Sequence, residues 1–466
     1  MYLKYFEEIS KIPHCSENEK ALSDYIVSFA KERGLWTYQD ESHNAVVKLP
    51  ASKGRENIAP VIIQGHIDMV GAKTTDSTHD FEKDPLTLVT RDGFLRANGT
   101  TLGADDGIAA AYALALIDGD FEHPPIEFVF TTCEEIGMVG VTALDFSVLS
   151  AKRCINIDEE TEGEFFASCA GGVRVNIEIP LEFEDAPLGG RFFEIRIGGL
   201  QGGHSGAMIH EQRANANRLL ARLLLELGDI ELARIEGGEK DNAIPRDASA
   251  VIYAKEKPDL SEYEKTFRKE FSAVDPYITI SITEVKSVRK ILTYAAKRSI
   301  LNAINSLPNG VIYHTAKREG EERLAETSAN LGVVAFFEKS VILASALRSS
   351  VASRKRELLS QFASVAELHR AGFSTEGDYP EWERAEKSEL RELFSRIYKR
   401  TFGKDAKISG VHAGLECGVF SKRIPQVDII AFGPTILDAH TPNERLDLAS
   451  AERMWKFLRE ILKSLT

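Results

Sequence analysis

Short, mostly apolar runs alternate with helical patterns through the first third of the chain. Residues 61–63 and 126–130 have the length and composition of buried strands. Residues 107–119, which lie between them, are rich in Ala and Leu and therefore favour a helix. Another apolar run follows at 154–157. This alternation predicts an α/β domain whose mixed, mostly parallel sheet is flanked by helices.

The pattern changes near residue 187, where an alternating strand begins around Phe193 and a helix rich in Leu and Arg follows. Strand runs and then a helix return after residue 330, so this region could contain two related halves. A long amphipathic helix and a last apolar strand then bring the chain back to the first domain. We therefore expect an inserted α+β domain at 187–375, between two segments of one α/β domain at 1–186 and 376–466.

Composition narrows the class of protein. The 466 residues suggest two or three domains, and a hydrophobic content of 43% can form sizeable cores. The net charge of −14 disfavours nucleic acid and anionic membranes as partners, and no apolar run is long enough to span a membrane. The N-terminal residues indicate a first helix and not a signal peptide. Five cysteines without a CxxC pair fit a reduced, cytoplasmic setting.

Imidazoles and carboxylates follow the ends of the predicted strands. They are His66 and Asp68 after the first run, Glu134 and Glu135 after the second, Asp158 after the third, His440 beyond the last strand, and Asp105 and Asp106 just before the Ala-rich helix. In an open parallel sheet, ligands bind outside the carboxyl ends of the strands. We therefore expect these side chains to meet at one edge of the sheet.

Two His residues and three carboxylates suit zinc, with cobalt or manganese as alternatives. Asp105, Glu135 and Asp158 contribute three negative charges, whereas two divalent ions contribute four positive charges. A shared carboxylate and a hydroxide would make a two-ion centre nearly neutral, while a single ion would leave excess negative charge. The sequence thus predicts two divalent metal ions.

Two further carboxylates have candidate roles beside these ligands. His66 and Asp68 share a face of an extended chain, so Asp68 could orient the His66 ring. Glu134, next to Glu135, could accept a proton from a water that the metals acidify. The plainer alternative for His66 and Asp68 is that they are two polar residues at a strand end. For Glu134 and Glu135 it is a solvated acidic loop.

The inserted region contains two further candidates. His204 lies among glycines in "GGHSG" (202–206), from where it could polarise a carbonyl group and stabilise an oxyanion. Arg348 could pair with a substrate carboxylate. A loop histidine and a solvated surface arginine are the corresponding alternatives.

Together these residues resemble the M20 metallopeptidases, and in particular the aminoacyl-histidine dipeptidase (Xaa-His dipeptidase) branch. The motifs that carry the resemblance occur in the family's order: "QGHIDMV", "HDFEKDPL", "RANGTTLGADDGIAAAYALA", "TTCEEIGMVG", "NIDEE", "GGHSG", "AGLECGVF" and "FGPTILDAHTPNERL". The resemblance implies a phosphorylase/hydrolase-like catalytic domain at 1–186 and 376–466, a lid and dimerisation domain at 187–375, and a homodimer.

The resemblance also implies roles for individual residues. They are His66, Asp105, Glu135, Asp158 and His440 as metal ligands, with Asp105 bridging both ions; Asp68 as the support of His66; Glu134 as general base; His204, from the same or the partner subunit, at the scissile carbonyl; and Asn242, Gly414 and Glu416 near the substrate. Arg348 joins this substrate-binding set. The bond between Asp105 and Asp106 is expected to be cis. Many family members have "ADNG" where this chain has Asp106, which changes a residue next to the bridge.

The resulting expectation is a cytoplasmic, two-metal dipeptidase that acts on small peptides, with Xaa-His substrates of the β-alanyl-histidine type as candidates. A related tripeptidase or aminopeptidase, or a deacylase of N-acyl amino acids, is an alternative. A non-catalytic metal- or peptide-binding protein is a third hypothesis. Glu134 disfavours it, because binding alone needs no spare base.

Overall fold

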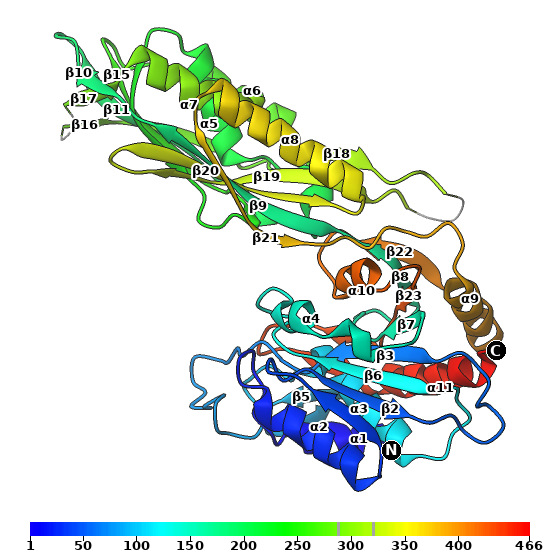
Figure 1. Ribbon diagram of the computed structural model, residues 1–466. Coiled ribbons are helices and arrows are strands. Elements are labelled where there is room, and N and C mark those ends of the chain that lie inside the picture. Colours follow the sequence, from blue (N-terminus) through cyan, green and yellow to red (C-terminus); the bar gives the residue numbers. More distant parts are fainter. Residues whose placement is uncertain (287–288, 319–321) are drawn as a thin grey trace. The chain divides into compact units, whose positions relative to one another are not determined.

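The computed structural model describes residues 1–286, 289–318 and 322–466, and the chain forms two compact units (Figure 1). Unit 1 consists of Met1–Cys169, Trp382–Gly410 and Leu415–Thr466, and unit 2 consists of Ala170–Glu381 and Val411–Gly414. Within the described ranges, no helix combines the length and apolar character that a membrane crossing requires.

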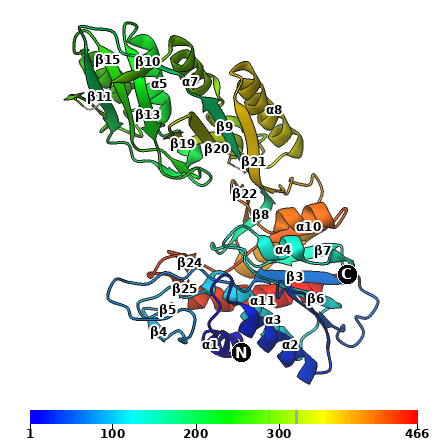
Figure 2. The same cartoon turned by 60° about the vertical axis from the view of Figure 1, so that its left-hand side comes forward.

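Unit 1 is built on an eight-stranded sheet (Figure 2). In spatial order its strands are β1 (Trp36–Gln39), β2 (Ala45–Leu49), β6 (Ile126–Thr131), β3 (Val61–His66), β7 (Arg153–Asn156), β23 (Asp428–Ala431), β8 (Glu164–Cys169) and β22 (Lys407–Val411). Strand β3 is parallel to β6 and β7, and β7 is parallel to β23. The antiparallel pairs are β1 with β2, β2 with β6, and β8 with β23. The predicted α/β fold with a mixed sheet is confirmed, and the parallel pairs form its centre.

The helices of unit 1 complete its core. They are α1 (Tyr2–Ile9), α2 (Lys20–Glu32), α3 (Ala104–Asp118), α4 (Val139–Ala143), α9 (Glu389–Phe402), α10 (Cys417–Arg423) and α11 (Leu448–Ser464). Helix α3 is buried from Ala104 to Ile117, which explains why its sequence is apolar on every side. Phe394 of α9 packs edge to face against Phe165 of β8 and Phe457 of α11, and Phe457 stacks on Phe165, so the two C-terminal helices are part of this core.

A second, smaller sheet in unit 1 joins distant parts of the chain. Its strands, in order, are β24 (Ile436–Leu437), β25 (Arg445–Asp447), β5 (Phe94–Ala97) and β4 (Leu88–Arg91). The pairing of β25 with β5 brings the segment around residue 440 close to the segment that leads into α3.

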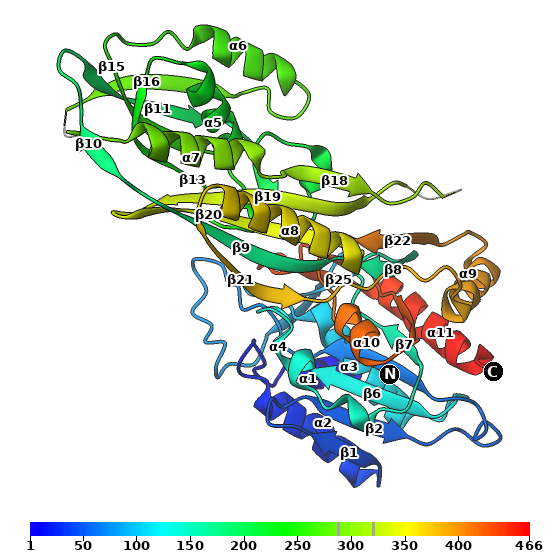
Figure 3. The ribbon, with the colours of Figure 1, turned by 45° about the horizontal axis from the view of Figure 1, so that its top comes forward.

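Unit 2 contains a nine-stranded sheet with helices packed on it (Figure 3). Its strands are β16 (Thr279–Val285), β11 (Arg191–Gly198), β15 (Ala248–Ala254), β13 (Glu231–Gly237), β19 (Ala325–Phe336), β20 (Ser340–Ser349), β9 (Gly171–Pro180) and β21 (Gly372–Tyr379), with β18 (Gly310–His314) beside β19. Its helices are α5 (Ala216–Glu226), α6 (Ser261–Glu270), α7 (Tyr294–Ser306) and α8 (Ala352–Leu368). Two short ribbons, β10 (Phe183–Asp185) with β17 (Lys290–Leu292) and β12 (Gly203–His204) with β14 (Ala243–Ile244), accompany the sheet.

The change from unit 1 to unit 2 comes earlier than the change in sequence pattern near residue 187. Strand β9 pairs along its length with β20 and also with β21, so it belongs to unit 2, which begins at Ala170. The same pairing extends unit 2 to Glu381, beyond the expected boundary at 375. The pairing of Gly237 in β13 with Val334 in β19 joins a group of four strands to a group of five, but a relation between two halves stays a prediction.

Candidate metal centre

The carboxyl ends of the parallel strands in unit 1 deliver polar side chains to one edge of the sheet. The residues are His66 at the end of β3, Glu134 and Glu135 after β6, Asp158 after β7, Asp105 in the first turn of α3, and His440 in the loop between β24 and β25. Their candidate ligand atoms form three overlapping groups, and within each group the atoms lie within 4.8 Å of one another. The groups are His66 with Asp105 and Asp158, Asp105 with Glu135 and His440, and His66 with Glu134 and Glu135.

Asp105 turns its two carboxylate oxygens towards two different histidines. Its Oδ1 atom lies 3.1 Å from Nε2 of His66, and its Oδ2 atom lies 2.9 Å from Nε2 of His440. His66 Nε2 is also 3.9 Å from Asp158 Oδ1, and His440 Nε2 is 2.8 Å from Glu135 Oε1. Asp105 therefore stands between two sets of donors, each with one imidazole and one further carboxylate.

The pKa shifts show that this cluster needs balanced charge. Hydrogen bonds to Asp105 and Glu135 raise the pKa of His440 to about 11. Burial raises the pKa of Asp105, but hydrogen bonds from His440 and His66 outweigh it and hold that pKa below its ordinary value. Burial raises the pKa of Asp158 well above the ordinary value, and neighbouring carboxylates add to this shift. Divalent cations would supply the positive charge that these carboxylates require, and the imidazole and carboxylate donors fit two such ions.

Asp68 connects His66 to the loop after β6. Its Oδ1 atom lies 3.3 Å from Nδ1 of His66 and accepts the backbone N–H of Glu134 at 3.0 Å. Its Oδ2 atom accepts the N–H of Glu135 at 3.2 Å and the hydroxyl of Ser16 at 2.8 Å. One buried carboxylate thus fixes both the ring that faces Asp105 and the backbone that carries the two glutamates.

Glu134 has an environment suited to holding a proton. Burial raises its pKa to about 8, and the nearby Glu416, Glu135 and Asp105 carboxylates contribute to this increase. A carboxyl group whose pKa lies near neutrality can both take up and release a proton at physiological pH. Its neighbour Glu135 instead contacts His440, so the two adjacent glutamates have different surroundings.

The peptide bond between Asp105 and Asp106 is cis, as the resemblance led us to expect. Asp106 packs against Gly65: a Cβ atom at Gly65 would lie 2.3 Å from Asp106 Oδ2. Gly65 therefore provides the space for this buried carboxyl, whose pKa is raised well above its ordinary value by burial. Among the described residues, Asp106 belongs to none of the three groups of candidate ligand atoms.

Glu416, which we expected to contact the substrate, is enclosed inside unit 1. Its side chain is fully buried, and its Oε2 atom accepts hydrogen bonds from Gln64 and, at 2.6 Å, from Thr131. Gln64 also accepts a hydrogen bond of 2.7 Å from Asn156. Because its carboxylate is enclosed between strands, Glu416 is unsuited to direct substrate contact and instead ties together β3, β6 and β7.

Sequence reasoning missed Glu444. Its carboxylate accepts backbone N–H groups from four consecutive residues: Leu102, Gly103, Ala104 and Asp105. No local pattern could have revealed this interaction, since the glutamate and its partners are separated by some 340 positions in the chain. Glu444 is the glutamate of "TPNERL" (441–446), and this motif was the only sequence signal at this site.

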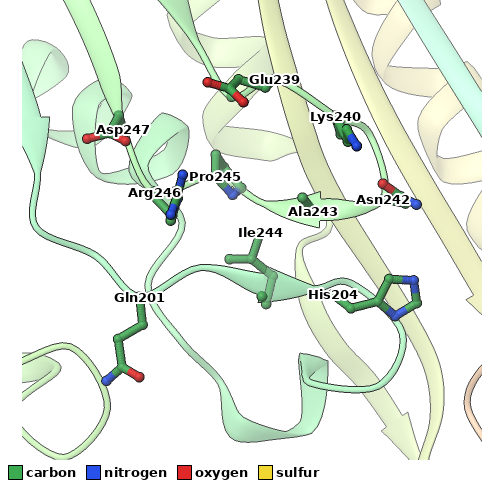
Figure 4. Close-up of a pocket in the computed structure, with 12 residues that line it drawn as sticks. Gln201, His204, Glu239, Lys240, Asn242, Ala243, Ile244, Pro245, Arg246 and Asp247 are labelled. Atoms are coloured by element: carbon green, nitrogen blue, oxygen red, sulfur yellow. The ribbon is translucent and has the colours of Figure 1, made fainter. Parts of the chain in front are cut away.

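Unit 2 brings together the expected substrate-side residues His204, Asn242 and Arg348. Strands β12 and β14 pair His204 with Ala243, so His204 and Asn242 lie at the same end of this ribbon (Figure 4). Both line a cavity of about 490 Å³. A Cβ atom at Gly206 would lie 3.0 Å from the His204 ring and 3.2 Å from Arg348 Nε, so the arginine reaches the same loop from β20.

Gly414 also belongs to unit 2, in the short segment 411–414. Two residues before it, His412 Nε2 lies 2.7 Å from the hydroxyl of Ser328, which pairs with Arg348 across β19 and β20. Sequence reasoning had not singled out His412. It is nevertheless one of the most strongly shifted groups of this unit, because burial lowers its pKa to about 3.

The chain is similar to known proteins over most of its length. The sequence model of Peptidase family M20/M25/M40 matches residues 62–464. A relative from Escherichia coli (strain K12), the cytosol non-specific dipeptidase, is 37% identical over 470 residues, which cover 99% of this chain and 96% of the relative. The crystal structure of aminoacylhistidine dipeptidase from Vibrio alginolyticus superposes with a TM-score of 0.93 at 34% identity and covers 100% of this chain and 96% of that one. Aminopeptidase PepT from Bacillus cereus shares the fold with a TM-score of 0.58 at 15% identity, over 100% of this chain and 98% of its own.

Proposed function

The chain belongs to Peptidase family M20/M25/M40 and is a metallopeptidase, and from this premise we propose that it hydrolyses dipeptides with the help of two divalent metal ions. The observation that carries the proposal is the position of Asp105, whose two oxygens face His66 and His440 on opposite sides. A carboxylate in this position can serve two cations at once.

In the proposed centre, His66 and Asp158 would hold one ion, Glu135 and His440 would hold the other, and Asp105 would serve both. When bound, the ions acidify a water molecule and polarise the carbonyl group of the scissile bond. Zinc suits the imidazole and carboxylate donors best, and cobalt or manganese are the alternatives. Asp68 keeps the His66 ring in place through its contact with Nδ1.

Glu134 acts as the general base and then as the acid in this proposal. Its carboxylate takes the proton of the attacking water and passes it to the nitrogen of the departing amine. Burial raises the pKa of Glu134 to about 8, which supports this role because both protonation states of the carboxyl are then accessible near neutral pH.

Unit 2 contributes the substrate-side groups. His204 Nδ1 accepts the backbone N–H of Ala207 at 3.1 Å, which leaves Nε2 to carry the proton and donate it to the substrate carbonyl oxygen. Burial and the nearby Arg348 lower the pKa of His204, so the ring stays neutral. Arg348 pairs with the substrate's terminal carboxylate, and Asn242 and Gly414 contact its backbone.

The same proposal includes the roles of the two units, the oligomeric state, the substrates and the location of the protein. Unit 1 is the catalytic domain, and unit 2 is a lid and dimerisation domain in a homodimer, where His204 can serve its own or the partner's active site. The substrates are dipeptides, with Xaa-His dipeptides among them. The names of the two most similar proteins described above support this class, and the cytosolic relative supports a cytoplasmic location.

A substrate panel tests the proposed function. Protein stripped with a chelator and then supplied with zinc, cobalt or manganese is assayed with β-alanyl-histidine, other dipeptides, a tripeptide and an N-acyl amino acid. We expect activity on dipeptides that disappears on stripping and returns with metal. Full activity after verified metal removal would contradict the metal requirement, and cleavage of only the tripeptide or the acyl amino acid would assign the chain to another M20 activity.

A further inference from the structure

Glu444 joins the two loops that carry His440 and Asp105. Its Oε1 atom accepts the N–H groups of Ala104 at 2.7 Å and Asp105 at 3.4 Å. Its Oε2 atom accepts the N–H groups of Leu102 at 2.7 Å and Gly103 at 3.0 Å. The side chain is buried, with only 3% of its surface exposed.

Within helix α3 the Asp106 carboxyl accepts the backbone N–H group of Ala109, but the residue before the helix provides no side-chain acceptor. Its N-cap residue is Gly103, which adopts a left-handed φ of 69° and offers no side chain to the first N–H groups of the helix. The backbone angles of Asp105 and Asp106 are not helical, so the N–H groups of residues 102–105 belong to a turn before the regular helix, and a distant carboxylate can satisfy these donors. Glu444 therefore fixes the turn from which Asp105 projects.

The other end of the link is the loop that carries His440. Glu444 lies four residues after His440, and its own N–H group bonds to the carbonyl oxygen of Thr441 at 3.0 Å. His440 has a φ of 62°, in the left-handed region that non-glycine residues seldom adopt. Such a conformation persists where the surrounding structure enforces it, and the anchored Glu444 carboxylate supplies one such restraint.

Building on the proposed metal function, we propose that Glu444 is a positioning residue, whose carboxylate holds Asp105 and His440 at the separation that one of the two cations requires. Glu444 does not contact the reacting atoms and acts through the two loops. The contact of 2.9 Å between Asp105 Oδ2 and His440 Nε2 is the geometry that it maintains.

The Glu444→Gln variant tests this role because it preserves the shape of the side chain. Its amide retains one acceptor oxygen but turns an NH₂ group towards two backbone donors. Zinc binding to the metal-stripped variant is measured by calorimetric titration. We expect one of the two zinc affinities to fall by about tenfold to a hundredfold. The variant should resemble His440→Ala, which lacks a ligand of the same ion.

Glu127 provides a matched control at the other end of β6. It is also a buried carboxylate, with an exposed fraction of 3%, and it accepts the N–H groups of Ser150 at 2.9 Å and Ala151 at 3.1 Å. Glu127→Gln should lower the melting temperature but leave both zinc affinities unchanged. Unchanged zinc affinities in Glu444→Gln, or an equal loss in Glu127→Gln, would overturn the inference.

The test also separates this inference from the proposed function. Failure of the wild-type protein to bind two zinc ions would overturn the two-metal function itself. If instead the wild type binds two ions and Glu444→Gln does too with the same affinities, only the positioning role fails. Should Glu444→Gln not fold, hydrogen exchange of the metal-stripped wild type decides: slow exchange of the amides at 102–105 supports the link, and rapid exchange there contradicts it.

Discussion

At the scale of single residues, the adjacent Glu134 and Glu135 provide a direct test of the chemistry. Glu134→Gln removes a group that can carry a proton but leaves all five proposed metal ligands in place. We expect kcat to fall by about 10²- to 10⁴-fold, with zinc binding retained. The measurement pairs steady-state kinetics with metal analysis of the purified variant.

The neighbouring Glu135→Gln variant is the control for this prediction. Glu135 Oε1 contacts His440 at 2.8 Å, so its loss should weaken zinc binding as well as activity. The same chemical change at two consecutive positions thus separates a base from a ligand. Wild-type turnover in Glu134→Gln would refute the assignment of the base.

His412 makes a prediction about pH and stability in unit 2. Burial, with Arg348 and His210 nearby, lowers its pKa to about 3, whereas a histidine in the unfolded chain has a pKa of about 6.5. Between these values the unfolded chain binds a proton that the folded chain does not, so stability is complete above about pH 6.5 and falls as the pH decreases. The slope for one such group approaches about 1.4 kcal/mol per pH unit.

Urea unfolding at about pH 7 and about pH 5 measures this effect. In His412→Gln the loss of stability on acidification should be smaller than in the wild type, because glutamine binds no proton. His314→Gln is the control in the same unit, since His314 is exposed. An equal acid sensitivity of His412→Gln and the wild type would show that His412 does not carry this dependence.

At the scale of elements, a buried polar network holds the ends of three strands together. Thr131 of β6 donates to Glu416 at 2.6 Å, and its hydroxyl also accepts a hydrogen bond of 3.2 Å from Gln64 of β3. Gln64 in turn bonds to Asn156 of β7. His66 and Asp158 lie two residues beyond Gln64 and Asn156 on the same strand segments, so this network lies directly behind the proposed ligands.

Thr131→Val tests the network with a change that conserves volume. It removes one donor to the buried Glu416 carboxylate, and we expect a loss of about 1–3 kcal/mol in the free energy of unfolding. Thr100→Val is the matched control: Thr100 is also buried, but its hydroxyl has no hydrogen-bond partner within the described part of the chain. Urea denaturation should show little or no loss in that variant. Equal losses would mean that the network contributes nothing specific.

The elements also show what the sequence could reveal. Strand and helix patterns predicted the α/β sheet, and the rule that parallel strands share one ligand-binding edge led to the cluster of His66, Asp105 and Asp158. The role of Glu444 could not be predicted because its hydrogen-bond donors are backbone N–H groups, and these do not depend on the residue types of the partners. The expected start of the inserted domain near residue 187 lies after the observed start at Ala170. The alternating apolar and polar residues of β9 predict a strand but not its unit, and only its pairing with β20 assigns it to unit 2.

At the scale of the whole molecule, the candidate chemistry is divided between the two units. All five proposed metal ligands belong to unit 1, and His204, Asn242 and Arg348 belong to unit 2. A ligand that binds only the native state stabilises the part of the chain that forms its site. Zinc should therefore stabilise unit 1 directly.

The chain offers a built-in probe for this last prediction, because its three tryptophans, Trp36, Trp382 and Trp455, all lie in unit 1. Zinc at about 100 times its dissociation constant should add about 2.7 kcal/mol to the stability reported by tryptophan fluorescence in urea. Hydrogen exchange should slow in zinc for peptides from β3 and α3 but not for peptides from the outer strands β11 and β16 of unit 2. Equal protection of both units would mean that they unfold as one cooperative structure, and no shift in the fluorescence transition would contradict the proposed location of the metal centre.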